Sequence, residues 1–514
     1  MTPTWNWMPS RHRTRQAVLA LAGLGVAVVV HAAPAVSAVP SSAPSGASSD
    51  VPLSAPAVAP GAKAPAPNTR GNADLVARGA YLATAGDCIA CHTAAHGKPF
   101  AGGQWLATPV GPIVSTNITS SKADGIGRYT LAQFGAALRQ GVRADGAHLY
   151  PAMPYTAYAK LSDADVEALY AYFQSGSVAP VDVAPATVTD LRFPFNIRLA
   201  MTFWNLLFLD RTPFAADASK SADWNRGAYL VQGLGHCSTC HTPRNVMMAE
   251  DTARPLAGAV VGGWYAPNIS SDPDSGIGTW SAADIADYLR TGHASGRAQA
   301  AGPMAEAIDN SFRYLTPADL RAMALYLKST PPVHDAADVR PADRWGAPGP
   351  GADAIRGMPL PAEPDRMSGA QLYDAYCATC HQARGEGVGA GGRAGAGLLA
   401  DAGADVAQPG LPSLFHNTAL GHGNSNNLVM VILQGARRQA GSVNGNGTVD
   451  GNGTVNGTRA TASGANVSMP AFGALLDDAQ IVTLGNYLLQ QYGNPRSRVT
   501  AEQVRTLRAN ESTP

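Results

Sequence analysis

Cys88-Ile89-Ala90-Cys91-His92 is the stretch that decides how this chain folds, and it occurs in two further versions. These are Cys237-Ser238-Thr239-Cys240-His241 and Cys377-Ala378-Thr379-Cys380-His381. The three pentapeptides contain all 6 cysteines of the 514-residue chain. Two thiols separated by two residues lie on one helical turn, and a histidine directly after them lies beside the same turn. The pattern predicts three sites of one kind.

The chemistry that needs this spacing is covalent attachment of haem. Two thiols on one turn can add to both vinyl groups of a haem, and the adjacent histidine then binds the iron. Zinc sites, thioredoxin-like redox pairs and disulfides also use paired cysteines, but none of them explains a histidine after each pair. We therefore expect three covalent haems c, attached through Cys88, Cys91, Cys237, Cys240, Cys377 and Cys380 and bound at iron by His92, His241 and His381.

The surroundings of the first two motifs repeat one another. Matching pairs of segments are Tyr81-Leu82 and Tyr229-Leu230, Asn117-Ile118 and Asn268-Ile269, and Gly125-Ile126-Gly127 and Gly276-Ile277-Gly278. Both units then have a capped helix start, at 161–165 and 315–319, followed by apolar residues at helical spacing. A third, more divergent unit predicts helices near 371–376, 427–434 and 478–491. Strand signals are weak, so the predicted fold is mostly α.

Three methionines are candidates for the sixth iron ligand. Met153 lies 61 residues after His92, and Met304 lies 63 residues after His241. Met469 lies 88 residues after His381, and the surplus coincides with an Asn-Gly-rich insertion at 441–465. A methionine thioether at this position closes the iron and raises its reduction potential, which favours electron transfer. The competing interpretation of any methionine is core packing.

These signals predict an order of segments along the chain. An arginine-containing start and the apolar stretch at 17–30 predict a signal peptide cleaved after 38, with an uncleaved anchor as the alternative. A flexible Ala/Pro/Ser-rich tether follows at 39–70. We then expect three domains: domain 1 at 71–180, which is the first repeat, domain 2 at 221–332, which is the second repeat, and domain 3 at 366–493, which is the third unit. Connectors lie between them at 181–220 and 333–365, and a tail follows at 494–514.

Charge and hydropathy limit the partners. Lys+Arg and Asp+Glu both total 37, so no basic excess indicates nucleic acid. The first connector contains an apolar patch, Phe193-Pro194-Phe195 and Phe203–Phe208, which is too short to span a bilayer. We expect it to pack between domains 1 and 2, with a partner or membrane contact as the alternative.

With these residues in place, the chain resembles the trihaem cytochrome c subunit of membrane-bound bacterial dehydrogenases that act on alcohols, gluconate, sorbitol and related sugars or aldehydes. The resemblance covers nearly all of 70–500, and its most specific stretches are 86–93, 99–103, 115–119, 145–155 and 302–306. It implies three tandem class I cytochrome c-like domains, each with one covalently bound haem.

The resemblance also implies a role. A catalytic subunit with a quinone, flavin or molybdenum cofactor, accompanied or not by a small third subunit, oxidises the substrate. Electrons then pass through the haems to ubiquinone or another respiratory acceptor, and the chain has no catalytic site of its own. The expected place is the periplasm, peripherally attached to the cytoplasmic membrane. A haem peroxidase, an oxidase-associated cytochrome subunit and a soluble electron shuttle stay open as alternatives.

Overall fold

The computed structural model describes residues 69–183, 189–387, 411–438, 448–449, 455–456 and 467–511. The expected signal peptide and nearly all of the expected tether lie outside these residues, as does most of the insertion at 441–465. The chain from Pro67 to Pro514 forms one compact unit. None of the helices in these described ranges has both the length and the hydropathy of a membrane span.

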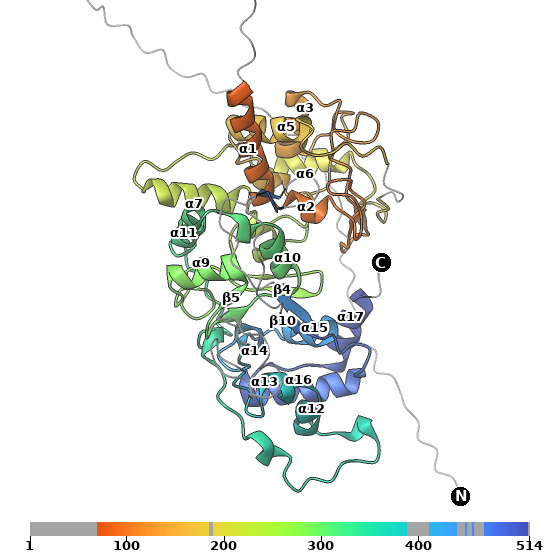
Figure 1. Cartoon of the computed structure of the whole chain (residues 1–514), viewed down its shortest axis with the longest axis vertical. Helices are drawn as coiled ribbons and strands as arrows, with labels where there is room; N and C mark the ends of the chain where they lie inside the picture. Colours follow the sequence, from red (N-terminus) through yellow and green to blue (C-terminus); the bar gives the residue numbers. More distant parts are fainter. Residues whose placement is uncertain are drawn as a thin grey trace, which may run out of the picture. The chain divides into compact units, whose positions relative to one another are not determined.

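The described part of the chain is mostly helical, and its strands form only short antiparallel pairs (Figure 1). The helices up to the second repeat are α1 (Thr69–Ala85), α2 (Cys88–Cys91), α3 (Leu131–Gln140), α4 (Tyr155–Tyr158), α5 (Asp163–Gln174) and α6 (Ala200–Phe208). The second repeat contains α7 (Ala222–Gln232), α8 (Cys237–His241), α9 (Ala282–Thr291), α10 (Gly302–Asn310) and α11 (Pro317–Leu327). The remaining helices are α12 (Gly369–Tyr376), α13 (Ala378–His381), α14 (Thr418–Gly421), α15 (Asn426–Gln434), α16 (Asp478–Tyr492) and α17 (Ala501–Glu511).

Short strands and single 3-10 turns connect these helices. The strand pairs are β1 (Trp105–Leu106) with β2 (Ile113–Val114), β3 (Ala259–Val261) with β4 (Trp264–Ala266), β5 (His293–Ala294) with β6 (Ala298–Gln299), β7 (Ala436–Arg438) with β10 (Val467–Met469), and β8 (Thr448–Val449) with β9 (Val455–Asn456). The 3-10 turns are η1 (Phe312–Tyr314), η2 (Ala342–Arg344), η3 (Gly351–Ala354) and η4 (Pro364–Arg366).

The predicted capped helices are confirmed. Ser162 accepts a hydrogen bond from the backbone N of Asp165 (3.2 Å) and starts α5, and Thr316 accepts one from Asp319 N (3.1 Å) and starts α11. In the third unit, α12, α15 and α16 begin within two residues of their expected starts. Side-chain oxygens at these positions satisfy backbone N–H groups that a first helical turn leaves unpaired.

In each unit the first helix packs against the last, as Figure 1 shows for α1 with α5, α7 with α11, and α12 with α16. A Cβ atom on Gly79 would lie 1.9 Å from the carbonyl oxygen of Ala168, and one on Gly227 would lie 1.9 Å from that of Ala322. In the third unit, a Cβ atom on Gly369 would lie 2.4 Å from the Cβ atom of Tyr487. Only glycine lets the helices approach so closely, so a glycine permits the contact between the first and the last helix in all three units.

The buried apolar residues form one large core for the first two repeats and another for the third unit. The first core joins Leu82 and Leu169 of the first repeat to Leu230 and Leu320 of the second without interruption. The core of the third unit is centred on α12, α15 and α16, with α17 packed against it. The first two repeats therefore share their hydrophobic interior.

A reciprocal pair of polar contacts joins the same two repeats. Tyr81 of the first donates its hydroxyl proton to Asp319 of the second (2.6 Å), and Tyr229 of the second donates to Asp165 of the first. Each aspartate also accepts from an arginine of its own repeat, Arg78 on Asp165 and Arg226 on Asp319. We refer to these four tyrosine and aspartate side chains as the Tyr–Asp exchange. The two repeats contact each other as two subunits of a twofold dimer do.

The apolar patch of the first connector forms α6, which has a packed face and an exposed face. Met201 and Trp204 lie in a small core with Tyr155 of the first repeat and Ala249 of the second. The indole Nε1 of Trp204 donates to the carbonyl oxygen of Met247 (2.9 Å). The expected packing between the first two repeats is thus confirmed for one face of α6. Phe203, Leu206 and Leu207 on the other face are exposed.

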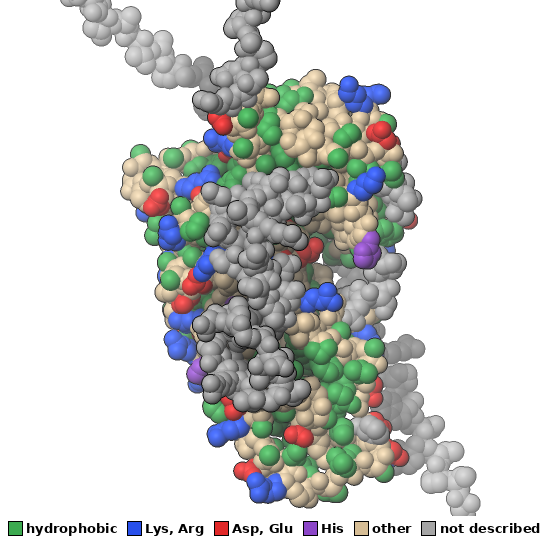
Figure 2. All heavy atoms as spheres, in the orientation of Figure 1, with side chains coloured by type: hydrophobic (Ala, Val, Ile, Leu, Met, Phe, Trp, Pro, Cys, Tyr) green, Lys and Arg blue, Asp and Glu red, His purple; other side chains and the backbone are tan. Residues whose placement is uncertain are grey.

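Polar contacts also join the second repeat to the third unit. The side chain of Asn427 accepts from Tyr265 N (2.9 Å) and donates to Tyr265 O (2.8 Å), which fastens α15 to β4. Thr418 N of the third unit donates to Arg297 O (2.9 Å), and the Arg297 side chain forms an ion pair with the buried Asp343 of the second connector. On the face drawn in Figure 2, positive and negative side chains are interspersed, in keeping with the balanced charge of the chain.

Candidate functional site

The three cysteine motifs lie on short helices directly after the first helix of each unit. They form α2, α8 and α13, the last of which begins one residue after Cys377. All six cysteines are unpaired, so each thiol is available for attachment. Cys88, Cys237 and Cys377 pack against the apolar cores, and burial raises the pKa of each of these thiols to about 12. Such thiols stay protonated at neutral pH, which does not suit redox cysteines.

Each motif histidine is held in the same way. The Nδ1 atom lies 2.7 Å from Thr116 O in His92, 2.6 Å from Pro267 O in His241, and 3.1 Å from Pro412 O in His381. A carbonyl oxygen can only accept, so Nδ1 carries the proton and Nε2 keeps its lone pair. Burial lowers the pKa of all three imidazoles, which favours the neutral form. A neutral imidazole oriented through its other nitrogen is what an iron ligand requires.

The carbonyls that orient the first two histidines belong to loops held by an asparagine. Asn117 donates to Val181 O (2.8 Å) and its Oδ1 accepts from Thr119 N (2.9 Å). Asn268 donates to Val333 O (2.6 Å) and accepts from Ser270 N (2.8 Å). Sequence reasoning identified both asparagines as repeated but assigned them no role. Their burial next to the histidine-binding carbonyl makes them positioning residues for His92 and His241.

The three candidate methionines lie against the same cores as their motifs. Met153 and Met304 are partly buried on the core that also contacts Cys88 and Cys237, and Met469 is partly buried on the core that contacts Cys377. Their backbones differ. Met153 lies in a turn before α4, Met304 near the start of α10, and Met469 at the end of β10.

The other methionines near the motifs are less suited to be ligands. Met247 and Met248 are 54% and 40% exposed, on a loop of the second repeat. Met323 and Met430 are each 1% exposed inside α11 and α15, where their side chains fill the cores. The assignment of Met153, Met304 and Met469 as iron ligands stays a prediction.

The first two motifs lie close to one another. Helix α10, which contains Met304 of the second repeat, contacts α2 of the first. Burial raises the pKa of Cys91 to about 12, and electrostatic interaction with Asp87, Glu306 and Cys240 adds to this effect. Interaction with Glu306 and Cys240 means that groups of the second repeat stand beside the first motif. The shared core therefore brings two candidate centres together.

Four of the other histidines have different partners or surroundings. His148 contacts Thr202 Oγ1 through Nε2 (3.0 Å), so this nitrogen faces the α6 segment. His293 Nδ1 contacts Gln299 Oε1 (3.1 Å), and His96 is exposed. His422 is buried beside the ring of Tyr265, and this burial lowers its pKa to about 4. None of these contacts resembles the histidine–carbonyl pairs of the three motifs.

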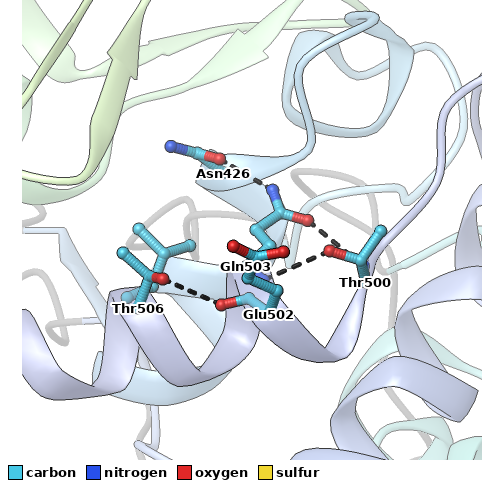
Figure 3. A pocket seen from close by; sticks show the side chains of 6 residues that line it. Asn426, Thr500, Glu502, Gln503 and Thr506 are labelled. Carbon is cyan, nitrogen blue, oxygen red and sulfur yellow. Dashed lines mark hydrogen bonds between the residues drawn. The ribbon is translucent and has the colours of Figure 1, made fainter. Parts of the chain in front are cut away.

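A surface pocket of about 300 Å³ lies between α15 and α17, away from the motifs. In Figure 3, Gln503 stands between Asn426 and Thr500 and bonds to both. These bonds cap α17 and fasten it to α15. The pocket contains no cysteine, histidine or methionine and therefore has no part in the candidate centres.

Comparison with known proteins gives two results. Residues 76–177 and 367–491 match the family described as Cytochrome c, while the second motif lies outside both matches. The chain is 42% identical to the fructose dehydrogenase cytochrome subunit of Gluconobacter japonicus over 84% of this chain and 82% of that one. It is 37% identical to the gluconate 2-dehydrogenase cytochrome c subunit of Pantoea cypripedii (86% and 91%). It is 34% identical to the alcohol dehydrogenase (quinone) cytochrome c subunit of Gluconacetobacter polyoxogenes (84% and 84%).

Proposed function

The chain belongs to the cytochrome c subunits of bacterial dehydrogenases, and on this premise we propose that it relays electrons through three covalently bound haems from a catalytic subunit to a membrane quinone. Membership of this family indicates that the chain binds haem c and transfers electrons for a dehydrogenase. The number of haems, their ligands, the final acceptor and the cellular place are the content of the proposal.

The observation that carries the haem count is the triple recurrence of one histidine geometry. His92, His241 and His381 each bond a backbone carbonyl through Nδ1 and leave Nε2 for iron. The second site, which has no family match of its own, has the same contact as the other two. The attaching cysteines are the motif pairs, and the proposed sixth ligands are Met153, Met304 and Met469. A bound haem supplies a metal that accepts and releases one electron without breaking substrate bonds.

The contacts between the first two repeats support a relay. Electron transfer needs centres held close together, and α10 of the second repeat contacts the motif helix α2 of the first. The Tyr–Asp exchange and the shared core hold this arrangement. The bond from Asn427 to Tyr265 O and the bond from Thr418 N to Arg297 O fasten the third unit to the second repeat. All three sites thus belong to one connected body.

The cellular location of the chain and the final electron acceptor are proposed from the sequence. The arginine-containing start and apolar stretch at 17–30 have the composition of an export signal, which directs the mature chain to the periplasm. There, the catalytic partner reduces the haems and ubiquinone at the cytoplasmic membrane accepts the electrons.

Native purification tests this proposal. We expect a dehydrogenase subunit to accompany the chain, three haems per chain by haem and protein assay, and reduction of the haem absorption bands by an alcohol, sugar or aldehyde. If no dehydrogenase accompanies the chain and none of these substrates reduces its haems, the proposed role is wrong. Replacing both cysteines of one motif by alanine should remove one haem, whereas Ser238→Ala inside the second motif should remove none.

A further inference from the structure

Strand β4 of the second repeat is connected to both proposed ligands of the second haem. The strand runs directly into Pro267, whose carbonyl oxygen accepts from His241 Nδ1 (2.6 Å). At its other end, Trp264 lies against Gly302, which begins α10 two residues before Met304. One short strand therefore supports the segment that orients the histidine and the segment that presents the methionine.

The contact between Trp264 and Gly302 leaves no space for a side chain on the glycine. A Cβ atom on Gly302 would lie 2.3 Å from Cε2 of the indole and 2.6 Å from Cδ2. The backbone of Gly302 has a φ of +53°, which glycine adopts without strain, and Pro303 restricts the backbone that follows. The indole thus lies directly on the backbone that starts α10, and its position determines where Met304 stands.

Two consecutive asparagines at the start of α15, in the third unit, hold β4 on both sides of its tryptophan. Asn426 Nδ2 donates to Gly263 O (2.9 Å). The amide of Asn427 pairs with both backbone groups of Tyr265, accepting from its N and donating to its O. The residues before and after the tryptophan are therefore both fixed by the third unit.

The third unit also contacts the tryptophan itself. Trp264 belongs to the second repeat but packs against the apolar core of the third unit. Gln503 of α17 donates to Asn426 Oδ1 (2.7 Å) and so fixes the orientation of that amide (Figure 3). Helices α10 and α15 both contact β4 (Figure 1). The strand is thus held between the segment that carries Met304 and the third unit.

We propose that Trp264 is a positioning residue for Met304, and that the third unit keeps it in place through Asn426 and Asn427. A metal ligand depends on the groups that orient it, and loss of such a group weakens metal binding roughly 10–100-fold. The second centre then depends on a unit that contributes neither of its ligands. This inference rests on the proposed function, because it takes His241 and Met304 as the ligands of the second haem.

Titration of the oxidised holoprotein with imidazole tests the proposal, since free imidazole competes with a methionine for haem iron. Met304→Ala identifies the second haem, because imidazole should bind there without a competitor. In Trp264→Leu, the apparent dissociation constant of imidazole at this haem should fall roughly tenfold below the wild-type value, since a poorly supported Met304 competes less well. Trp264→Phe keeps an aromatic ring against Gly302 and should stay close to wild type.

Asparagine variants measure the support that comes from the third unit. Asn427→Ala should change imidazole binding in the same direction as Trp264→Leu. Asn486→Ala is the matched control, because the amide of Asn486 pairs in the same way with Val499 O (2.9 Å) and Val499 N (3.0 Å) inside the third unit. Trp224→Leu, in α7 of the second repeat, is the control for the loss of an indole. Both controls should bind imidazole as wild type does.

Two results overturn the inference while the proposed ligands stand. These are equal imidazole binding by Trp264→Leu and Trp224→Leu, and equal binding by Asn427→Ala and Asn486→Ala. If Met304→Ala itself leaves imidazole binding unchanged, Met304 is not a ligand, and the proposed ligand set fails together with the inference. The haem-to-protein ratio of each variant is measured on the same samples. Asn427→Ala decides the outcome if Trp264→Leu fails to fold.

Discussion

Removing the hydroxyl groups of the Tyr–Asp exchange should loosen the contact between the first two repeats. In Tyr81→Phe the lost group donates to Asp319 Oδ2 (2.6 Å) and accepts from Thr316 N (3.1 Å). A hydrogen bond to a charged group contributes about 1.5–3 kcal/mol. Asp319 keeps both bonds from Arg226 and is not left unpaired, so we expect Tyr81→Phe to lower the free energy of unfolding by about 1.5 kcal/mol.

The second half of the exchange should respond in the same way. Tyr229→Phe removes the bond to Asp165, which keeps its bonds from Arg78, and should also cost about 1.5 kcal/mol. The double variant should lose about 3 kcal/mol if the halves are independent. Arg226 of one half also interacts with the charge of Asp165 of the other, so a departure from this sum is expected and measures the coupling.

Urea unfolding followed by haem absorbance and tryptophan fluorescence measures these effects. A chain of several units need not unfold in one step, so the transition of the first two repeats is compared between variants. Tyr170→Phe is the matched control, since its hydroxyl donates to Tyr129 O (2.8 Å) inside the first repeat. It should cost about 0.5–1.5 kcal/mol. A double variant that unfolds no earlier than Tyr170→Phe would contradict the reasoning.

Three further predictions concern the sites, the helix crossings and acid. Met304→Ala should convert one haem in three to a high-spin form with a lower potential, seen by electron paramagnetic resonance and redox titration, while Met323→Leu should leave the spectrum unchanged. Gly227→Ala should lower the free energy of unfolding by at least about 1–3 kcal/mol, because the added Cβ would lie 1.9 Å from Ala322 O. Gly423 has open space around it, so Gly423→Ala should lower the free energy of unfolding by less than about 1 kcal/mol. Thermal unfolding of both variants measures the difference. Burial opposes ionisation of Asp319, but bonds from Arg226 and Tyr81 outweigh it and lower its pKa. The ionised Asp319 carboxylate should therefore stabilise the fold fully above about pH 4, and this stabilisation should be lost as the pH falls through the lowered pKa. In Asp319→Asn, the free energy of unfolding should not show this decrease when the protein is titrated with acid.

Local patterns in the sequence were sufficient to predict the elements and the motif positions. The capped starts at Ser162 and Thr316 and the helices of the third unit follow from short-range rules. Those rules concern neighbouring residues on one element. The cysteine motifs and their histidines are of the same kind, since five consecutive residues carry the whole pattern.

Contacts between distant segments could not be predicted in this way. Tyr81 and Tyr229 were visible as repeated residues, but nothing in either repeat indicates that each tyrosine reaches into the other. The role of Asn117 depends on Val181, which lies 64 residues away. The similar spacings of Met153 and Met304 did not show that Met153 lies in a turn before α4 while Met304 lies in α10, because Gly302-Pro303 begins a helix in the second repeat. The apolar residues of α6 were recognised, but their division into a packed and an exposed side depends on the surrounding structure.

The Tyr–Asp exchange has a consequence for how the chain is made. Tyr81 and Asp319 are 238 residues apart, so the first repeat is synthesised long before its partner exists. Until residue 319 follows, Tyr81 lacks its acceptor and the apolar side of α1 that packs on the second repeat is uncovered. Long-range contacts of this kind form slowly and leave apolar surface open to aggregation. In the export that we propose, passage across the membrane and attachment of haem would coincide with the period in which the first repeat is incomplete, and the second repeat would end that period when it arrives.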